Sequence, residues 1–465
     1  MKITIIGGGI SGLYACMELA TQGYSIDLYE QHASYGGRMK TKYDKKNESV
    51  LYETGPWRIH PSHHRVLKLI ERLGLSVKTI SLQPHWKKFP KKKQKTKKRQ
   101  DRITLLTELS VTIYQNLCRA KNLDAANIDM QRTGYDMIFQ EGYQPHQHFI
   151  ENDKKYMVLE HGFTSLVDAI VHQLESMPHV RLHRNHRMTD IHRKNNTYEI
   201  QLKKRTGHND YELKTIKTSC VFLALPPADL KKISSLTLHP NLATVGSFPL
   251  LHTYARSSEM AKDFGKYICN SPISQIISTC FQNDWFQISY TGGRLAMLFH
   301  NLYLSSKTKW NDYIRREFYN YFPKSVTLHE ITPHFWRHAV HYWHPNFKTT
   351  ASKLSMKNIQ PHPQKYPNMY MIGESISTIQ GWVEGALETT DIAVSLLKQN
   401  HQPPPTFPKE YVIYDNRILN VAQWKMVHPG SREAIENHMG EDITDLWNEF
   451  HPQTASKYLL SLEVR

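Results

Sequence analysis

Cysteine is scarce and is not arranged for a structural purpose. Five cysteines occur among the 465 residues, an odd number, and no two of them form a CxxC pair. The sequence therefore encodes neither a disulfide framework nor a thiolate zinc site. We expect the protein to reside in the cytoplasm or another reducing intracellular compartment.

Long apolar runs are also missing. No stretch approaches the roughly 20 consecutive apolar residues of a membrane-spanning helix, and after Met1 the chain enters a glycine-punctuated strand pattern instead of a signal sequence. Hydrophobic residues still make up 40% of the chain, which is enough to bury a substantial core. We expect a soluble, unsecreted protein with no membrane span.

Acidic residues are too few to balance the basic ones. The chain has 42 Asp and Glu against 59 Lys and Arg, a formal net charge of +17. Much of this excess lies in KKFPKKKQKTKKRQDR, Lys87–Arg102. Such a block attracts polyanions through counterion release, but it lacks interleaved aromatic residues that would stack on bases. It is either a solvated loop or a nonspecific polyanion contact.

The N-terminal residues follow the pattern of a dinucleotide-binding β-α-β unit. Residues 2–6, KITII, predict a buried strand, and a helix and a second strand follow. In GxGxxG, Gly7 allows the tight turn, Gly9 lets the backbone approach a pyrophosphate, and Gly12 lets the helix pack close to the strand. Glu30 ends the second strand, where it would accept hydrogen bonds from a ribose. The sequence therefore predicts dinucleotide binding.

FAD and NAD share this turn, and later motifs distinguish them. These motifs are ASYGGRMKT, ETGPWRIH, HRMTDI, VFLALPPADL and MIGESISTIQGWVEGALETT. With them, the chain up to about residue 397 resembles the flavin-containing amine oxidase superfamily, which includes monoamine and polyamine oxidases and related desaturases. The resemblance implies FAD, held noncovalently because no cysteine stands where some members attach it. It implies cofactor contacts from Gly36, Gly37, Arg38, Gly55, Pro56, Trp57, Arg58, Met188, Gly373, Glu374, Trp382 and Val383.

The same resemblance implies catalytic positions. A helix that starts near Val383 would direct its N-terminus at the flavin, where its dipole stabilises the negative charge of the reduced ring. Members of the family flank the path to the flavin with two aromatic side chains, which would be Trp382 and Trp343 here. Amine oxidases usually place a lysine near the flavin that assists the reaction with oxygen, but FPLLHTYARS offers His252 instead. The resemblance therefore argues against an oxygen-dependent oxidase.

The C-terminal residues carry a second pattern. A hairpin-like YVIYDNRILNV precedes His-Pro-Gly at 428–430, and a Gly-x-Asp-x-Thr segment and another histidine follow. This order resembles the cytochrome b5 heme-binding fold, with Ser431 where a second glycine is usual. The resemblance implies that His428 and His451 ligate the iron of a heme b. Because two histidines fill both axial positions, such a heme serves electron transfer.

These patterns predict an α/β protein: an FAD-binding Rossmann-like domain with an interleaved α+β substrate domain, and a small C-terminal cytochrome b5-like α+β domain. Two histidine clusters, HPSHH and RHAVHYWH, are expected to be solvated or hydrogen-bonded and not metal ligands. A proline-rich stretch, HQPPPTFP, marks the boundary between the modules. The expected parts are FAD-binding segments at about 1–65, 157–235 and 365–398, substrate segments at about 66–156 and 236–364, a linker at 401–408, and a heme domain at 409–465.

Three functions are compatible with these observations. The first is a flavoenzyme that oxidises a small-molecule reductant, an amine or a similar C–H donor, and passes electrons through the heme to a one-electron acceptor or redox partner protein. The second is a desaturase or protoporphyrinogen-oxidase-like activity on a flat apolar substrate. The third is a basic, non-catalytic binding or structural protein that retains a redox fold. The basic segment and the middle of the chain also resemble amine-oxidase-like proteins of large DNA viruses, which would place the protein in a virion.

Overall fold

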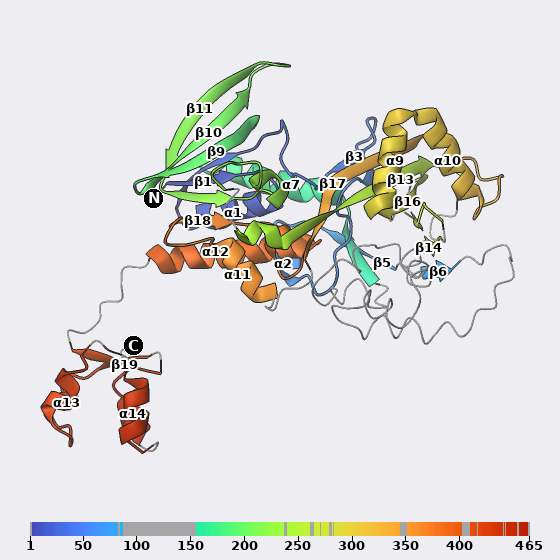
Figure 1. Cartoon of the computed structure of the whole chain (residues 1–465). Helices are drawn as coiled ribbons and strands as arrows, with labels where there is room; N and C mark the ends of the chain where they lie inside the picture. The colour runs from blue at the N-terminus through green and yellow to red at the C-terminus, as the bar shows by residue number, and fades with distance from the viewer. Residues whose placement is uncertain are drawn as a thin grey trace. The chain divides into compact units, whose positions relative to one another are not determined.

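The computed structural model forms two compact units, Met1–Ser395 and Leu396–Arg465 (Figure 1). The predicted basic contact at Lys87–Arg102 and the linker residues 402–408 lie outside the described residues. The structure describes residues 2–81, 84–86, 155–236, 240–260, 265–269, 271–278, 281, 283–344, 351–401, 410–415, 417–439, 441, 443–452 and 455–463.

A five-stranded parallel sheet begins the first unit, with the strand order β18-β12-β1-β2-β8. Strand β1 pairs in parallel with both β2 and β12, and helix α1 connects β1 to β2. Strands β1 and β12 are buried at nearly every position, as is typical of parallel strands that are covered on both faces. The bounds are β1 Lys2–Ile6, α1 Ile10–Ala20, β2 Ser25–Tyr29, β8 Val180–His183, β12 Cys220–Leu223 and β18 Met369–Met371.

Helices and a second sheet cover this parallel sheet. Helix α1 packs against α7, and the three-stranded antiparallel sheet β9–β11 contacts β1 and β12. Helix α12 lies beside α1, because Thr390 donates to the Ser11 carbonyl and the Tyr14 hydroxyl donates to Asp391 at 3.0 Å. The bounds are α7 Gly162–Glu175, β9 His186–Lys194, β10 Thr197–Arg205, β11 Tyr211–Thr218 and α12 Val383–His401.

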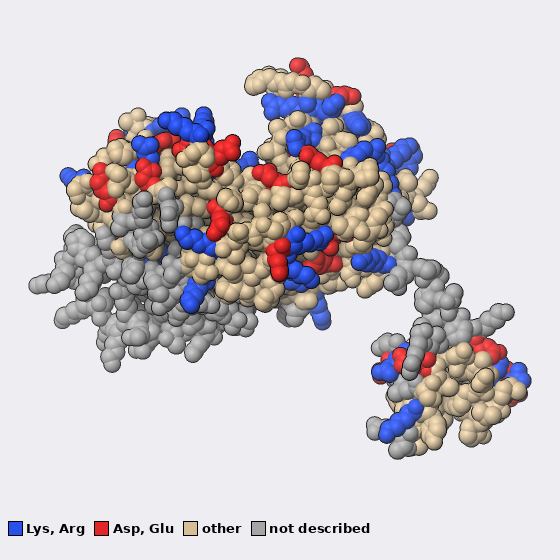
Figure 2. Space-filling view, turned by 180° about the vertical axis from the view of Figure 1, so that it is seen from behind, with Lys and Arg blue, Asp and Glu red and all other residues tan. Residues whose placement is uncertain are grey.

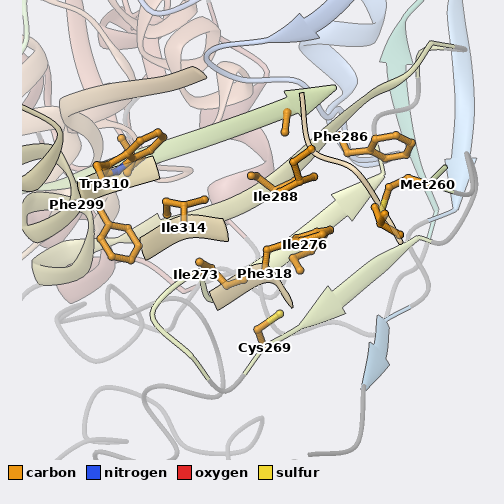
Figure 3. Close-up of a cluster of buried hydrophobic side chains, with 14 of the residues drawn as sticks. Met260, Cys269, Ile273, Ile276, Phe286, Ile288, Phe299, Trp310, Ile314 and Phe318 are labelled. Carbon is orange, nitrogen blue, oxygen red and sulfur yellow. The ribbon is translucent and has the colours of Figure 1, made fainter. Parts of the chain in front are cut away.

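A six-stranded sheet, in the order β17-β13-β16-β15-β14-β6, forms the other half of this unit. One face packs on helices α9 and α10 through a buried hydrophobic cluster that includes Ile276, Phe286 and Trp310 (Figure 3). The other face is part of the candidate site described below. The bounds are β6 Pro84–Trp86, β13 Val245–Arg256, β14 Lys266–Ile268, β15 Gln275–Ser278, β16 Trp285–Gly292, α9 Gly293–Ser305, α10 Lys307–Tyr319 and β17 Ile331–Trp343.

Short elements connect these layers. Strand β3 pairs with β4, and β5 pairs with β7, both in antiparallel fashion. The bounds are β3 Thr41–Tyr43, β4 Val50–Glu53, α2 His64–Arg72, β5 Val77–Ser81, β7 Lys155–Leu159, α8 Pro227–Leu230, 3₁₀ helix η2 Pro240–Thr244, α11 Ala351–Ile359 and 3₁₀ helix η3 Glu374–Ile376.

The second unit is a small α+β domain. A hairpin of β19 and β20 packs with short helices around a core of Val412, Leu419, Val421, Ile435 and Trp447, among others. The predicted α/β fold class with this added domain is confirmed, and none of the described helices is long and apolar enough to cross a membrane. The bounds are β19 Tyr411–Tyr414, β20 Arg417–Asn420, η4 Trp424–Met426, α13 Arg432–Glu436, α14 Thr444–Phe450 and α15 Ser456–Leu460.

The buried carboxyl group of Glu53 gives the first unit a testable pH dependence. Burial raises the pKa of Glu53 to about 7, although the Phe163 N–H (2.6 Å) and the Thr41 hydroxyl bind the carboxyl and oppose this shift. A raised pKa means that the folded protein favours the protonated form. This stabilisation is present below pH 4.5, the ordinary value, and is lost as the pH rises towards 7.

Glu53→Gln keeps the shape of the side chain and cannot ionise, so all other titrating groups are shared with the wild type. We therefore expect the free energy of unfolding of Glu53→Gln to rise relative to that of the wild type by about 3 kcal/mol between pH 4.5 and pH 7, given the cited shift. Denaturant unfolding at several pH values measures the difference. Glu160→Gln, at an exposed position, is the control, and an equal loss of pH dependence in this control would contradict the assignment.

Candidate functional site

The glycine turn after β1 combines close packing with open space. A Cβ at Gly7, where φ is +107°, would lie 2.5 Å from the Ala224 carbonyl oxygen. A Cβ at Gly12 would lie 1.9 Å from the Gly7 carbonyl oxygen, so the first and third glycines are required by packing. A Cβ at Gly9 would meet nothing within 4 Å. The backbone at Gly9 is therefore open to a ligand, as pyrophosphate binding requires.

Glu30 lies next to this turn at the end of β2. Its buried carboxylate accepts hydrogen bonds from the backbone N–H groups of Gly8 at 2.7 Å and His32 at 2.8 Å. Glu30, Gly7 and Met188 line one cavity of about 140 Å³. The structure thus brings together three residues that were predicted to hold the nucleotide half of FAD.

The GGR loop folds over the glycine turn. Gly36 forms a β-bridge with Gly9, and a Cβ at Gly37 would lie 3.4 Å from the Gly9 Cα. Both loop glycines have positive φ values, 102° and 59°, which favour glycine. A Cβ at Gly55 would lie 1.9 Å from the Arg38 carbonyl oxygen. The loop and the following segment are therefore held close to the open backbone at Gly9.

Arg38 and the buried Glu374 form a charged group with a third partner. The Arg38 guanidinium donates to a Glu374 carboxylate oxygen and to the Ala339 carbonyl, each at 2.6 Å. His341 lies 2.5 Å from the same carboxylate, and the Gly381 N–H donates to its other oxygen at 2.8 Å. Burial alone would raise the pKa of Glu374, but His341, Arg38 and this N–H hold it well below its usual range. Glu374 is therefore ionised and fixed in place.

His341 is a member of this group that the sequence did not reveal. It is 1% exposed, and its Nε2 has no hydrogen-bond partner. The histidines of RHAVHYWH were predicted to be solvated or hydrogen-bonded, but the sequence did not indicate that His341 would contact Glu374. Gly373 precedes Glu374 with a φ of +142°, and a Cβ there would come no closer than 3.8 Å to its neighbours. Gly373 is thus another open position of the backbone.

Trp382 and Trp57 belong to one buried group, which we call the aromatic cluster. Helix α12 begins at Val383, directly after Trp382, so the helix N-terminus lies where the resemblance predicted. Trp343 is buried at the end of β17 and is not a member of this cluster. The aromatic cluster consists of Trp57, Tyr156, Val158, Phe248, Leu250, Ile277, Tyr290, Val340 and Trp382.

Arg58 extends the segment of Gly55, Pro56 and Trp57 along the cluster. Its guanidinium carbon lies 4.8 Å from the ring centroid of Trp57 and 5.2 Å from that of Tyr156. Cations over aromatic faces are attracted by the ring quadrupole, so this arrangement holds the arginine at the edge of the aromatic cluster.

His252 lies in β13 beside the aromatic cluster. Its ring centroid is 4.8 Å from that of Tyr290, which is its partner on β16. Burial, together with the nearby His334 and Arg58, lowers the pKa of His252 to about 3. The imidazole is therefore neutral, and it does not replace the positive charge of a lysine.

The second unit brings His428 and His451 together. Their ring centroids are 6.0 Å apart. Two imidazoles that bind one metal ion from opposite sides, with metal–nitrogen bonds of about 2 Å, would have centroids about 6 Å apart. His428 Nδ1 donates to the Ser431 carbonyl at 3.1 Å, which leaves Nε2 as the ligand atom. His451 stacks on Trp447 at 3.8 Å. This geometry fits a bis-histidine heme.

Ser431 stands where the cytochrome b5 pattern usually has glycine, and it adopts a backbone conformation that favours glycine while its side chain caps a helix. Ser431 has a φ of +105°, in the region that favours glycine, which accounts for the glycine usual at this position. Its hydroxyl accepts a hydrogen bond from the Ala434 N–H and caps α13.

Thr444 of the predicted Gly-x-Asp-x-Thr segment accepts a hydrogen bond from the Asp415 N–H at 2.8 Å and so connects α14 to the hairpin. Gly440 and Asp442 lie outside the described residues.

Comparison with protein families agrees with this geometry. Residues 10–145 and 142–396 match the flavin containing amine oxidoreductase model. The chain belongs to that family. Residues 396–465 match the cytochrome b5-like heme/steroid binding domain. The first match implies FAD and the second implies heme, as the sequence predicted.

Each individual relative matches only a short part of this chain. The flavin-dependent L-tryptophan oxidase of Lentzea aerocolonigenes is 36% identical over 78 residues, 17% of this chain and 16% of that protein. The zeta-carotene desaturase of Capsicum annuum is 27% identical over 92 residues, 20% of this chain and 15% of that protein. An L-amino-acid oxidase of Bothrops jararacussu is 32% identical over 80 residues, which are 17% of this chain and 16% of that protein. The chain thus spans about a sixth of the length of these curated relatives.

Solved structures match a much larger part of this chain. Wild-type putrescine oxidase bound to putrescine superposes with a TM-score of 0.64 and 15% identity, covering 86% of this chain and 99% of that one. An Exiguobacterium protein assigned as a protoporphyrinogen oxidase has a TM-score of 0.64 and 14% identity. The superposition covers 86% of this chain and 99% of that one. At such low identity these likenesses show the fold alone.

We expect Glu30→Ala and Arg38→Ala each to weaken FAD binding by about 1.5 to 3 kcal/mol, the value of hydrogen bonds to charged groups. The measurement is flavin retained after gel filtration, followed by titration of the apoprotein with FAD. Glu18→Ala and Arg72→Ala are matched controls, because this acid–base pair is 2.5 Å apart at the surface, away from the glycine turn. Unchanged flavin content in both Glu30→Ala and Arg38→Ala would show that these residues do not hold FAD. If the protein precipitated with acid keeps the yellow colour of the flavin, the cofactor is attached covalently, which would contradict noncovalent binding.

Proposed function

We propose that the chain is an FAD-dependent oxidoreductase that takes a hydride from an amine or a similar C–H donor and passes the electrons to its C-terminal heme b. The observation that supports this most is the 6.0 Å pair of His428 and His451 in a unit that accompanies a flavin module. A bis-histidine heme has no free axial position for oxygen or substrate, so its role is one-electron transfer. A one-electron acceptor or redox partner protein would then oxidise the heme.

Residues of the first unit supply the environment for the hydride step. FAD, when bound, supplies the hydride acceptor. The N-terminus of α12 favours negative charge beside it. Trp57 and Trp382 provide apolar surface that excludes water from this region. The Arg38–Glu374 pair spans 336 residues of sequence and holds the GGR loop to the segment before α12, so that both face the cofactor together.

A single spectroscopic experiment tests this function. The purified protein should show the bands of both flavin and six-coordinate heme. Under anaerobic conditions, primary amines, polyamines and L-amino acids are added one at a time, and an oxidisable compound should bleach the flavin before the reduced heme bands appear. If a compound fully reduces the flavin while the heme stays oxidised, electrons do not pass between the two centres, and the fused-enzyme function fails.

A desaturase-like activity on a flat apolar substrate is the second candidate. The apolar character of the aromatic cluster favours it, as does the match to a carotene desaturase. Reduction of the flavin by a carotenoid or a porphyrinogen, and by no amine, would establish this alternative.

A non-catalytic, polyanion-binding role has less support from the described surface. Basic side chains gather on the projecting sheet β9–β11 (Figure 2), but acidic residues lie among them. Glu199 contacts Lys194 and Lys217, and Glu212 contacts Lys204. These ion pairs offset part of the positive charge. Salt-dependent DNA binding by protein that contains neither cofactor would favour this role.

A further inference from the structure

Helices α2 and α12 meet at their N-termini, where one carboxylate joins them. Glu384 lies in the first turn of α12 and is 2% exposed. Its carboxylate accepts hydrogen bonds from the backbone N–H groups of Arg65 at 3.2 Å and of Val66 at 3.0 Å. Both N–H groups belong to the first turn of α2, where such groups have no partner within the helix. Glu384 therefore caps α2 from a position 319 residues further along the chain.

The same carboxylate forms an ion pair with Arg65. The Arg65 guanidinium donates to Glu384 at 3.2 Å and to Asp391, further along α12, at 2.9 Å. The side chain of Arg65 is 40% exposed, whereas that of Glu384 is 2% exposed. A buried charge is costly without a compensating charge, so Arg65 compensates the carboxylate from the protein surface. Because solvent screens the exposed charge more strongly than the buried one, the carboxylate dominates the field inside the protein.

This junction of α2 and α12 adjoins the aromatic cluster. Trp382, a member of the cluster, directly precedes α12. The ring of His63, directly before α2, lies edge-on to Trp382 with the ring centroids 4.7 Å apart. A Cβ at Gly385 would lie 2.2 Å from the Ile379 carbonyl oxygen, so the first turn of α12 packs tightly on the segment before it. Glu384 is therefore held at the end of α12 that the proposed function places beside FAD.

Charges at this position act on the flavin with opposite signs. A helix N-terminus carries the equivalent of about half a positive charge, which favours the negative charge of the reduced ring. A carboxylate in the first turn cancels part of this effect, and a guanidinium that pairs with the carboxylate restores part of it. Neither side chain has to touch the cofactor, because the interaction acts through space.

We propose that Glu384 and Arg65 set the reduction potential of the bound FAD, with Glu384 making the flavin harder to reduce and Arg65 limiting this effect. The proposal rests on the position of FAD at the N-terminus of α12 in the proposed function. A flavin that is harder to reduce also gives up its electrons more readily. The two charges thus divide the energy of the reaction between oxidation of the substrate and electron transfer to the heme.

Reduction potentials of full-length variants that carry FAD and heme test the proposal. Each protein is reduced anaerobically with dithionite in the presence of a reference dye, and absorption spectra follow the dye and the flavin. Glu384→Gln keeps the size of the side chain and removes its charge. The equilibrium with the dye should shift about 10-fold towards reduced flavin, which is about 30 mV for this two-electron couple. Arg65→Met should shift it about 10-fold towards oxidised flavin.

The opposite signs separate a charge effect from a structural one. A loosened junction of α2 and α12 would not respond to the sign of the removed charge, so it would shift both variants in the same direction. Shifts in the same direction, or no shift in either variant, would overturn the proposal. The double variant Glu384→Gln/Arg65→Met should return to within about 3-fold of the wild type, because the removed charges compensate each other.

Asp391→Asn is the matched control. Asp391 shares the Arg65 guanidinium with Glu384, but it lies about two turns further along α12, and its side chain is 39% exposed. Because solvent screens exposed charges, its replacement should shift the dye equilibrium by less than about 3-fold. A shift as large as that of Glu384→Gln would show that the effect does not depend on the helix N-terminus, and it would overturn the proposal.

Binding of oxidised FAD shows whether the variants keep their structure. The oxidised ring is uncharged, so the affinity of each apoprotein for FAD should stay within about 3-fold of the wild-type value. If Glu384→Gln protein does not retain FAD, variants at the partly exposed Arg65 decide the question. A lower potential in Arg65→Met than in Arg65→Lys, which keeps the charge, supports the proposal, and equal potentials in these two variants overturn it.

The outcome is distinguishable from failure of the proposed function, because the titration uses dithionite and no substrate. If Glu384→Gln and Arg65→Met shift in opposite directions but no amine reduces the flavin, the charge effect stands and the oxidation of amines fails. If an amine reduces the flavin and then the heme while both variants keep the wild-type potential, the proposed function stands and the charge effect fails.

Discussion

Replacing His451 with alanine should abolish the six-coordinate heme spectrum and leave the flavin content unchanged. One remaining imidazole cannot fill both axial positions, and the FAD contacts belong to a different unit of the chain. Because electrons leave through the heme in the proposed function, reduction of cytochrome c driven by substrate should fall to the background rate. Absorption spectra and anaerobic stopped-flow measurements on the full-length variant check both results.

His438→Ala is the matched control for this variant. His438 lies in the same unit, is partly exposed and pairs with Glu441 at 2.9 Å. Its replacement should leave both the heme spectrum and electron transfer intact. A six-coordinate spectrum that persists in the His451→Ala protein would show that another residue ligates the iron and would remove this part of the site.

Oxygen should reoxidise the reduced flavin slowly, because one well-placed positive charge is worth roughly 100-fold and the neutral His252 supplies none. Cytochrome c, which takes electrons through the heme in the proposed function, should reoxidise it faster. His252 occupies the predicted place of the lysine that assists oxygen in related oxidases. Its pKa of about 3 keeps it neutral, so the oxygen reaction should also be independent of pH above about pH 5.

The measurement reduces the protein anaerobically with dithionite and mixes it with air-saturated buffer or with cytochrome c. His451→Ala protein serves as the control, since it should lose the fast reaction with cytochrome c and keep the slow one with oxygen. Rapid reoxidation in air with stoichiometric hydrogen peroxide would refute the expectation and would identify the protein as an oxidase.

The local motifs were predictable because short-range geometry determines them. The turn with Gly7, Gly9 and Gly12 joins β1 to α1 over a few residues. Gly7 and Gly12 are close to backbone atoms and Gly9 is open, as the sequence predicted. His428 and Ser431 form another local motif, in which a residue with positive φ and a hydrogen bond orients the imidazole. In both cases the chemistry follows from residues that are near neighbours in the chain.

Side chains whose roles depend on strand register were not predictable. His341 reaches Glu374 because β17 runs beside the segment before α12, and nothing in RHAVHYWH indicates this neighbour. For the same reason Trp57, and not Trp343, shares the aromatic cluster with Trp382. Long-range pairing decides these contacts, and a single sequence does not contain it.

The strand order β18-β12-β1-β2-β8 determines when the protein can acquire FAD during its synthesis. Strand β1 is translated first, but its neighbour β12 and the outer strand β18 are encoded far downstream. At about 5 to 20 residues per second, β18 leaves the ribosome roughly 20 to 70 s after β1. Throughout this interval the nascent β-α-β unit lacks Glu374, and one edge of the growing sheet stays unpaired. The complete sheet, with Glu374 next to Arg38, can therefore form only after about four fifths of the chain has been made.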